Sequence, residues 1–277
     1  MCIRDRSSPR DTADAARSSA SRAQDSAPFQ VAARTGFAVN GLLHLVIGVI
    51  ALHVAFGKGG AADQSGALSN IAQEPFGRVA LWVVAVGLWS LGAFYVLDGA
   101  LVRGIDAKAW SERAKGFGKG VVYVAIGVTA ATFAAGGSSN STHQSRSLSA
   151  KLLAAPGGVV LLVLLAAAVA AVGVSLIVIG LRRSFLKDIA RPPGGLGHAT
   201  ELLGAIGYVA KGVAITVVGI LFGVAAFTSD AAKAKGLDGA VQALAALPFG
   251  KVILTAVAIG LLAFGVFCFA RARYGRL

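Results

Sequence analysis

Residues 156–181 read PGGVVLLVLLAAAVAAVGVSLIVIGL, and this stretch decides the fold class of the chain. Ser175 is its only polar side chain. A helix of about 20 predominantly apolar residues crosses the roughly 30 Å hydrocarbon core of a bilayer, so the stretch predicts a transmembrane helix. Five other runs meet the same criterion, and the six predicted spans are 36–56, 77–102, 115–135, 156–181, 204–228 and 249–270.

The composition agrees with a membrane protein. Of the 277 residues, 56% are hydrophobic and only 14% are charged, and the mean hydropathy is +0.72. Ordinary soluble domains carry about 25% charged residues. Six long apolar runs leave too little polar sequence to cover a water-soluble core, so that class is disfavoured. The sequence therefore predicts an all-α, polytopic membrane protein with six transmembrane helices.

The net charge of +13 is distributed unevenly about these spans. Clustered Lys and Arg can bind nucleic acid, but here their positions indicate membrane topology. The two tails and the even-numbered connections carry seventeen cations, namely Arg4, Arg6, Arg10, Arg17, Arg22, Arg34, Arg103, Lys108, Arg113, Lys115, Arg182, Arg183, Lys187, Arg191, Arg271, Arg273 and Arg276. The odd-numbered connections and their flanks carry seven: Lys58, Arg78, Arg146, Lys151, Lys233, Lys235 and Lys251. The positive-inside rule therefore predicts cytoplasmic N- and C-termini in a bacterial cell membrane.

The same charges predict the partners of the chain. Cations close to a membrane surface gain about 1 kcal/mol each from anionic lipid headgroups. We therefore expect contacts with the lipid bilayer and with anionic headgroups at the cytoplasmic face, and no binding of nucleic acid.

Residues 1–32 are expected to form a polar, disordered leader. Its first six residues, MCIRDR, resemble translated sequencing-adapter sequence and are left out of functional reasoning. No cleavable signal peptide is expected, because the first apolar run follows this polar leader. Cys2 in the leader and Cys268 in the last span offer no disulfide framework and no CxxC metal motif.

One two-span pattern occurs three times, over residues 33–105, 106–183 and 198–272. The first helices share glycines at matching positions, and the second helices begin with a Pro-x-Gly motif. The repeat-motif and helix-packing residues are Gly41, Gly48, Pro75, Gly77, Gly120, Gly127, Pro156, Gly212, Gly219, Pro248 and Gly250. Small residues allow helices to approach closely in lipid, so Gly41, Gly120 and Gly212 are expected to mark equivalent helix contacts. Three units in one orientation predict a pseudo-threefold arrangement if they close into a ring.

The motifs resemble those of a bacterial membrane family catalogued as domain of unknown function 1206. The most specific match is DQSGAL at residues 63–68, continued by QEPFGR at 73–78, together with the Gly-aromatic start of each first helix. Repeat two departs from the pattern, because Gly157 stands where the other repeats have an aromatic residue. The resemblance covers the whole membrane domain and implies three tandem two-span units. It implies no activity.

The segment between the two spans of each repeat is expected to form a short interfacial helix. In repeat one Asp63 and Ser65 can cap its amide groups, while Leu68, Ile71 and Ala72 fall on one face. Repeat three shows Val241, Leu244 and Leu247 at similar spacing. Packing over the bundle is favoured over binding a partner. The proline is expected to start the next span. In repeat two the Ser-rich residues 136–149 are interpreted as a flexible loop.

Four polar residues within the spans are the candidate functional site. Asn40 and His44 lie on one face of the first helix, and Tyr95 and Asp98 lie on one face of the second, at similar depth. In one interpretation His44 and Asp98 form a proton-responsive pair or line a polar cavity. In the favoured interpretation they are structural, with Asp98 hydrated near the interface or paired with Arg103, and His44 hydrogen-bonded to a neighbouring helix.

No catalytic, cofactor-binding or metal-binding motif is recognised, so no enzymatic activity is expected. His44 and His53 are nine residues apart and lie on opposite faces of one helix, which prevents a shared metal. Two functions remain open. The chain is either a structural or interaction protein of the membrane or a passage for a small solute, an ion or a proton. Only isolated polar positions are visible in the spans, which favours the first.

Overall fold

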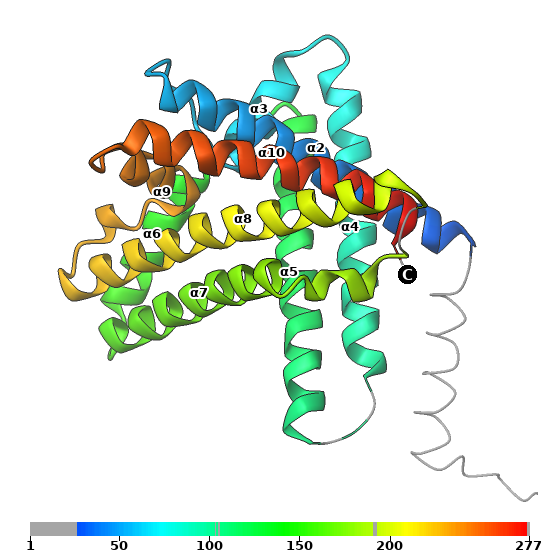
Figure 1. Cartoon of the computed structure of the whole chain (residues 1–277). Coiled ribbons are helices and arrows are strands. Elements are labelled where there is room, and N and C mark those ends of the chain that lie inside the picture. Colours follow the sequence, from blue (N-terminus) through cyan, green and yellow to red (C-terminus); the bar gives the residue numbers. More distant parts are fainter. Residues whose placement is uncertain (1–26, 103, 105, 191–192, 276–277) are drawn as a thin grey trace, which may run out of the picture.

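A computed structural model describes residues 27–102, 104, 106–190 and 193–275. Within these residues the fold is all-α (Figure 1). The long helices are α2 (Ala27–Ala55), α4 (Gly77–Leu101), α5 (Ala107–Ala134), α7 (Gly158–Leu181), α8 (Gly195–Phe227) and α10 (Gly250–Tyr274). Three shorter helices join the two long helices of each repeat: α3 (Gln64–Gln73), α6 (Ser141–Ala154) and α9 (Gly236–Ala245). Two 3₁₀ turns, η1 (Ser184–Asp188) and η2 (Ala231–Lys233), lie in the connections.

The six predicted spans are confirmed, since all six long helices are long and apolar enough to cross a bilayer. Several extend beyond the apolar run. α2 begins at Ala27, so residues 27–32 of the predicted disordered leader are helical, while residues 1–26 lie outside the described part. The guanidinium of Arg34 donates to the carbonyl of Arg273 at 3.1 Å, which ties this extension to the end of α10. Helix α2 thus begins before the apolar run that predicted the span, in a more polar part of the sequence.

Four of the spans form a layer in the order α7, α8, α10 and α2, and the α4–α5 pair crosses it at a steep angle (Figure 1). The most extensive contacts are α7 with α8, α4 with α5, and α10 with α2. Each of these pairs joins the second span of one repeat to the first span of the next, with repeat three followed by repeat one. Within repeats, α2 packs on α4 and α8 on α10, but α5 and α7 make no comparable contact. The pseudo-threefold arrangement stays a prediction.

Glycines form the closest approaches in these three pairs. An added Cβ at Gly41 would lie 2.8 Å from the carbonyl oxygen of Gly265. The equivalent distances are 3.0 Å from Gly120 to Gly92 and 2.7 Å from Gly212 to Gly173. The recurrent glycine of each first span therefore faces a glycine on the second span of the preceding repeat, not a helix of its own hairpin.

The Pro-x-Gly motifs form the entrances of α4, α7 and α10. The first helical residue is the glycine, so the proline lies two residues before the helix and does not start it as predicted. The middle residue adopts the left-handed conformation: φ is 62° at Phe76, 72° at Gly157 and 61° at Phe249. The glycine of the motif is needed for this tight turn, because a Cβ at Gly77 would overlap the carbonyl oxygen of Ile71.

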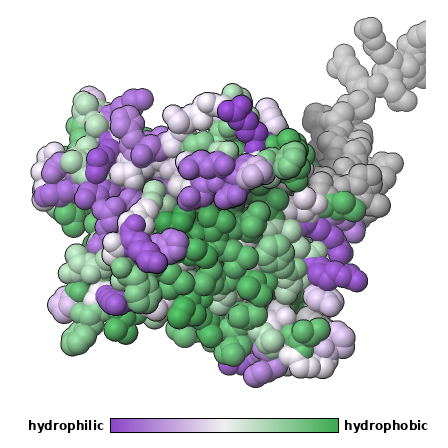
Figure 2. All heavy atoms as spheres, turned by 90° about the horizontal axis from the view of Figure 1, so that it is seen from above, coloured by the Kyte–Doolittle hydropathy of each residue, from purple (hydrophilic) through white to green (hydrophobic). Residues whose placement is uncertain are grey.

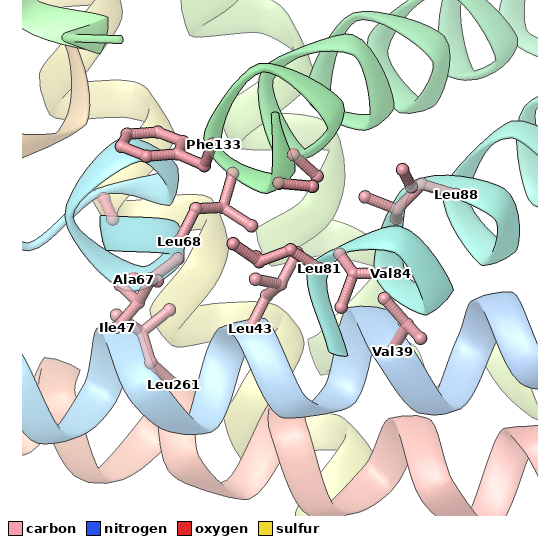
Figure 3. Packing of buried hydrophobic residues seen from close by; sticks show 14 of the residues in the cluster. Val39, Leu43, Ile47, Ala67, Leu68, Leu81, Val84, Leu88, Phe133 and Leu261 are labelled. Atoms are coloured by element: carbon pink, nitrogen blue, oxygen red, sulfur yellow. The ribbon is translucent and has the colours of Figure 1, made fainter. Parts of the chain in front are cut away.

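The short helices pack over the bundle as predicted. Asp63 caps α3 by accepting from the amide of Gly66 at 2.9 Å, and Leu68 is fully buried. Figure 3 shows Leu68 among side chains of α2, α4 and α5, including Leu43, Leu81 and Phe133.

In repeat two the flexible-loop prediction was wrong for residues 141–149, and the short helix expected between the two spans of each repeat is confirmed there. Residues 141–154 form α6, because Asn140 caps the helix by accepting from the amide of His143 at 2.8 Å.

The surface is suited to lipid. Figure 2 shows a broad hydrophobic area across the middle of one face with hydrophilic residues beside it. α7 is the least buried span, and its Val160 and Leu164 are 63% and 61% exposed. Exposed apolar surface of this extent on six long helices is typical of a surface that a bilayer covers.

Candidate functional site

A cavity of about 280 Å³ lies between the short helices and the long helices α2, α7, α8 and α10. We call it the vestibule. Its outer lining includes Gln64, Ser141 and Ser145, and its inner lining includes His44 and Lys211. His44 is the midpoint of the span Ala33–Ala55, and Lys211 lies halfway along α8. The vestibule therefore connects the layer of short helices with the middle of the membrane domain.

His44 is held by its own helix. Its Nδ1 donates to the carbonyl oxygen of Asn40 at 2.8 Å, which leaves Nε2 of the neutral ring as an acceptor. The amide of Asn40 donates to the sulfur of Cys268 at 3.4 Å, linking α2 to α10. The favoured prediction placed the bond of His44 on a neighbouring helix. In the structure the hydrogen bond to a neighbouring helix is made by Asn40, which donates to Cys268 of α10.

Lys211 lies over an aromatic ring at the inner end of the vestibule. Its Nζ is 4.3 Å from the ring centroid of Phe264, and the ring of His44 is 4.7 Å from the same centroid. Phe264 also makes an edge contact with Tyr208 at 5.2 Å. Phe264 therefore contacts two lining residues, His44 and Lys211, and also Tyr208, which is not among the lining residues.

Beyond Phe264 lies a cluster of tyrosines and cations, with one tyrosine from each repeat. Tyr95 and Tyr123 stack at 5.6 Å, and Arg271 donates to the hydroxyl of Tyr208 at 3.2 Å. Arg271 also approaches Asp188 at 3.5 Å. These contacts join α4 to α5 and α10 to both α8 and η1.

Two carboxylates hold the short helices together at the mouth. Asp238 accepts from the amide of Ala62 at 3.2 Å and from the side chain of Gln242 at 2.8 Å. Burial raises the pKa of Asp238, and the nearby charge of Asp63 adds to this rise, while the bond from Ala62 opposes it. Ser65 donates to Asp63 and accepts from the amide of Ser141, which joins repeats one and two.

The predicted site residues are only partly brought together. Asn40, His44 and Tyr95 are buried, but Asp98 is exposed and makes no hydrogen bond or ion pair with His44 among the described side chains. Electrostatically its main neighbour is Lys119 on α5. The predicted pair of His44 and Asp98 is therefore not formed, because Asp98 faces away from the vestibule.

Sequence reasoning missed Lys211, which is the only charged residue lining the vestibule in the part of the chain that the structure describes. The sequence did offer a signal for Lys211, because it lies in the middle of an apolar run. A cation at such a position is costly in a membrane and often marks a functional residue. Contacts such as Tyr208 with Arg271 had no such signal, because they join residues 63 positions apart. Among the described residues no three His, Cys, Asp or Glu side chains are grouped as a metal site requires.

Six spans in three two-span units with short connecting helices define a class of repeat-built polytopic membrane proteins. The sequence pattern of the Domain of Unknown Function (DUF1206) matches residues 35–101, 114–183 and 206–275, and the chain belongs to this family. It is similar to Uncharacterized protein YxxB of Bacillus subtilis (strain 168), with 29% identity over 246 residues that cover 87% of this chain and 89% of that protein. No solved structure matches the chain.

Proposed function

We propose that the protein provides a passage for a small solute across the bacterial cell membrane, with the vestibule as its binding site. The observation that supports this proposal is the cavity of about 280 Å³ that leads from the short helices to His44 and Lys211. Polar groups at the middle of a membrane are costly, and they are typical of solute and ion pathways. No catalysed reaction is part of the proposal, since passage needs only binding and opening.

Phe264 is the residue that we expect to close this passage. Its ring contacts the lining residues His44 and Lys211 and also Tyr208, which is not among the lining residues. Passage would require the ring to move, because the cluster around Tyr208 and Arg271 is packed behind it. In this proposal a solute enters the vestibule from the short-helix side and leaves past the ring of Phe264.

Flux measurements in proteoliposomes test this function. We expect the wild type to transport at least one solute from a panel of inorganic ions, short carboxylates and small neutral molecules. Phe264→Leu should increase that flux. Phe267→Leu is the matched control, because Phe267 packs against Tyr208 and Phe264, whereas the ring contacts with the lining residues His44 and Lys211 belong to Phe264.

If neither the folded wild type nor Phe264→Leu transported any solute of the panel, the proposed transport function would be contradicted. Equal increases in both variants would mean that the ring of Phe264 does not act as a gate.

The second candidate is the structural or interaction protein that the sequence favoured. It is supported by Phe76 and Phe249, which are 88% and 84% exposed at the entrances of α4 and α10. Rings held outward at two equivalent positions could anchor the protein in the lipid interface or contact another membrane protein. Failure of the flux test would direct attention to these positions.

For the orientation we propose cytoplasmic termini and short helices on the outer side. The supporting observation is the excess of cations in the tails and in the connections on the same side. The vestibule would then open outward, and anionic headgroups would lie against the basic cytoplasmic side.

A further inference from the structure

We infer that the vestibule binds a small anion at Lys211. This inference rests on the passage proposed above and names the class of its solute. Among the described residues the lining contains one charged side chain, Lys211, and one further titratable side chain, His44. No Asp or Glu is among the lining residues. A solute at the inner end therefore meets positive charge with no carboxylate beside it.

Lys211 lacks the partner that an intramembrane cation usually has. Among the described residues no carboxylate forms an ion pair with it, and its ammonium group lies over the uncharged ring of Phe264. Arg271 and Arg183 differ, since Arg271 approaches Asp188 and Arg183 pairs with Glu201. Charges within membranes are normally paired or hydrated. An anion in the vestibule would supply the missing counter-charge.

The carboxylates at the mouth do not oppose this assignment. Asp63 accepts from Ser65 and from the amide of Gly66, and Asp238 accepts from Ala62 and Gln242. Neither carboxylate lines the vestibule. The outer lining instead offers the hydroxyls of Ser141 and Ser145 and the amide of Gln64, which can donate to an anion.

The volume limits the size of the anion. A cavity of about 280 Å³ holds the equivalent of roughly nine water molecules, at about 30 Å³ each. It is smaller than the roughly 300–1,000 Å³ of pockets for drug-sized ligands. Inorganic anions and short carboxylates fit within this volume.

Binding is measured by isothermal titration on the full chain in nanodiscs of zwitterionic lipid. The probes are the sodium salts of chloride, nitrate, formate, lactate and phosphate. We expect saturable binding of at least one anion to the wild type. Lys211→Met keeps an apolar stem and removes the charge, and it should weaken binding at least about tenfold, whereas Lys211→Arg should retain it.

Lys119→Met is the matched control. Lys119 is also a lysine within a span and lies 4.9 Å over the ring of Tyr95, but it does not line the vestibule. Its removal lowers the net charge equally, so a general electrostatic effect would weaken binding in both variants. We expect Lys119→Met to bind like the wild type.

Three results would overturn the inference: no anion binding by the folded wild type, equal binding by Lys211→Met, or equal weakening in the two Met variants. Stabilisation by added anionic lipid without binding of any soluble anion would also overturn it, because the occupant would then be a lipid phosphate. Flux of a neutral solute that persists in Lys211→Met would retain the passage and reject the anion. Absence of flux and binding for every solute would reject both.

Discussion

Phe76 and Phe249 are non-glycine residues in the left-handed conformation, with φ of 62° and 61°. This conformation costs an L-residue about 1–2 kcal/mol because Cβ crowds the backbone. Repeat two has Gly157 at the matching position, with φ of 72°. The other two repeats therefore keep an unfavourable residue whose ring is exposed, which suggests that the ring itself is useful.

Replacing Phe76 by glycine should relieve this strain. We expect Phe76→Gly to raise the free energy of unfolding by about 1 kcal/mol, since glycine adopts positive φ without a Cβ clash. Thermal unfolding in one detergent measures the change. Phe76→Ala is the control, because it removes the ring and keeps the Cβ. If both variants changed the unfolding temperature equally, loss of the ring, and not relief of backbone strain, would account for the change in stability.

At the scale of helices, the α4–α5 pair depends on close backbone approach. A Cβ at Gly116 would lie 2.7 Å from the Cα of Gly99 and 2.9 Å from the carbonyl oxygen of Tyr95. Two residues along the same helix, a Cβ at Gly118 would meet no atom within 4 Å. The two glycines have the same helix propensity, but Gly116 is packed against α4 and Gly118 has open space around it.

This contrast yields a matched pair of substitutions. Gly118→Ala should leave stability unchanged or raise it by up to about 1 kcal/mol, because alanine is the better helix former. Gly116→Ala should lower stability by about 1–3 kcal/mol, because backbone atoms must move apart to admit the methyl group. Thermal unfolding of both variants in the same detergent tests this. A Gly116→Ala variant as stable as Gly118→Ala would refute tight packing of α4 on α5.

For the whole molecule, the proposed orientation makes an accessibility prediction. His143 on α6 and Lys187 in η1 are both exposed and lie on opposite sides of the predicted membrane. In a background with Cys2→Ser and Cys268→Ser, we expect an impermeant maleimide to label His143→Cys in intact cells. Lys187→Cys should react only after permeabilisation. The reverse pattern would invert the orientation, and labelling of both in intact cells would contradict the six-span topology.

The sequence alone determined the class of fold and much of its local structure. Six apolar runs predicted six spans, because a helix must be apolar over a set length to cross hydrocarbon. Asp63 predicted the cap of α3, because capping involves residues three positions apart. The recurrence of Gly41, Gly120 and Gly212 predicted close helix contacts, since lipid favours small residues between helices. All of these signals are local or periodic.

Only the tertiary structure decided which helices meet and what lies between them. The contact of Gly41 with Gly265 joins the first and last spans, and no pattern in the sequence specifies that neighbour. His44, Lys211 and Phe264 come together from three helices, whereas Asp98 turns away, although its spacing suited a pair with His44. The physical reason is that hydropathy and helical period determine each span separately. The position of a side chain relative to other spans depends on the packing of all the helices at once.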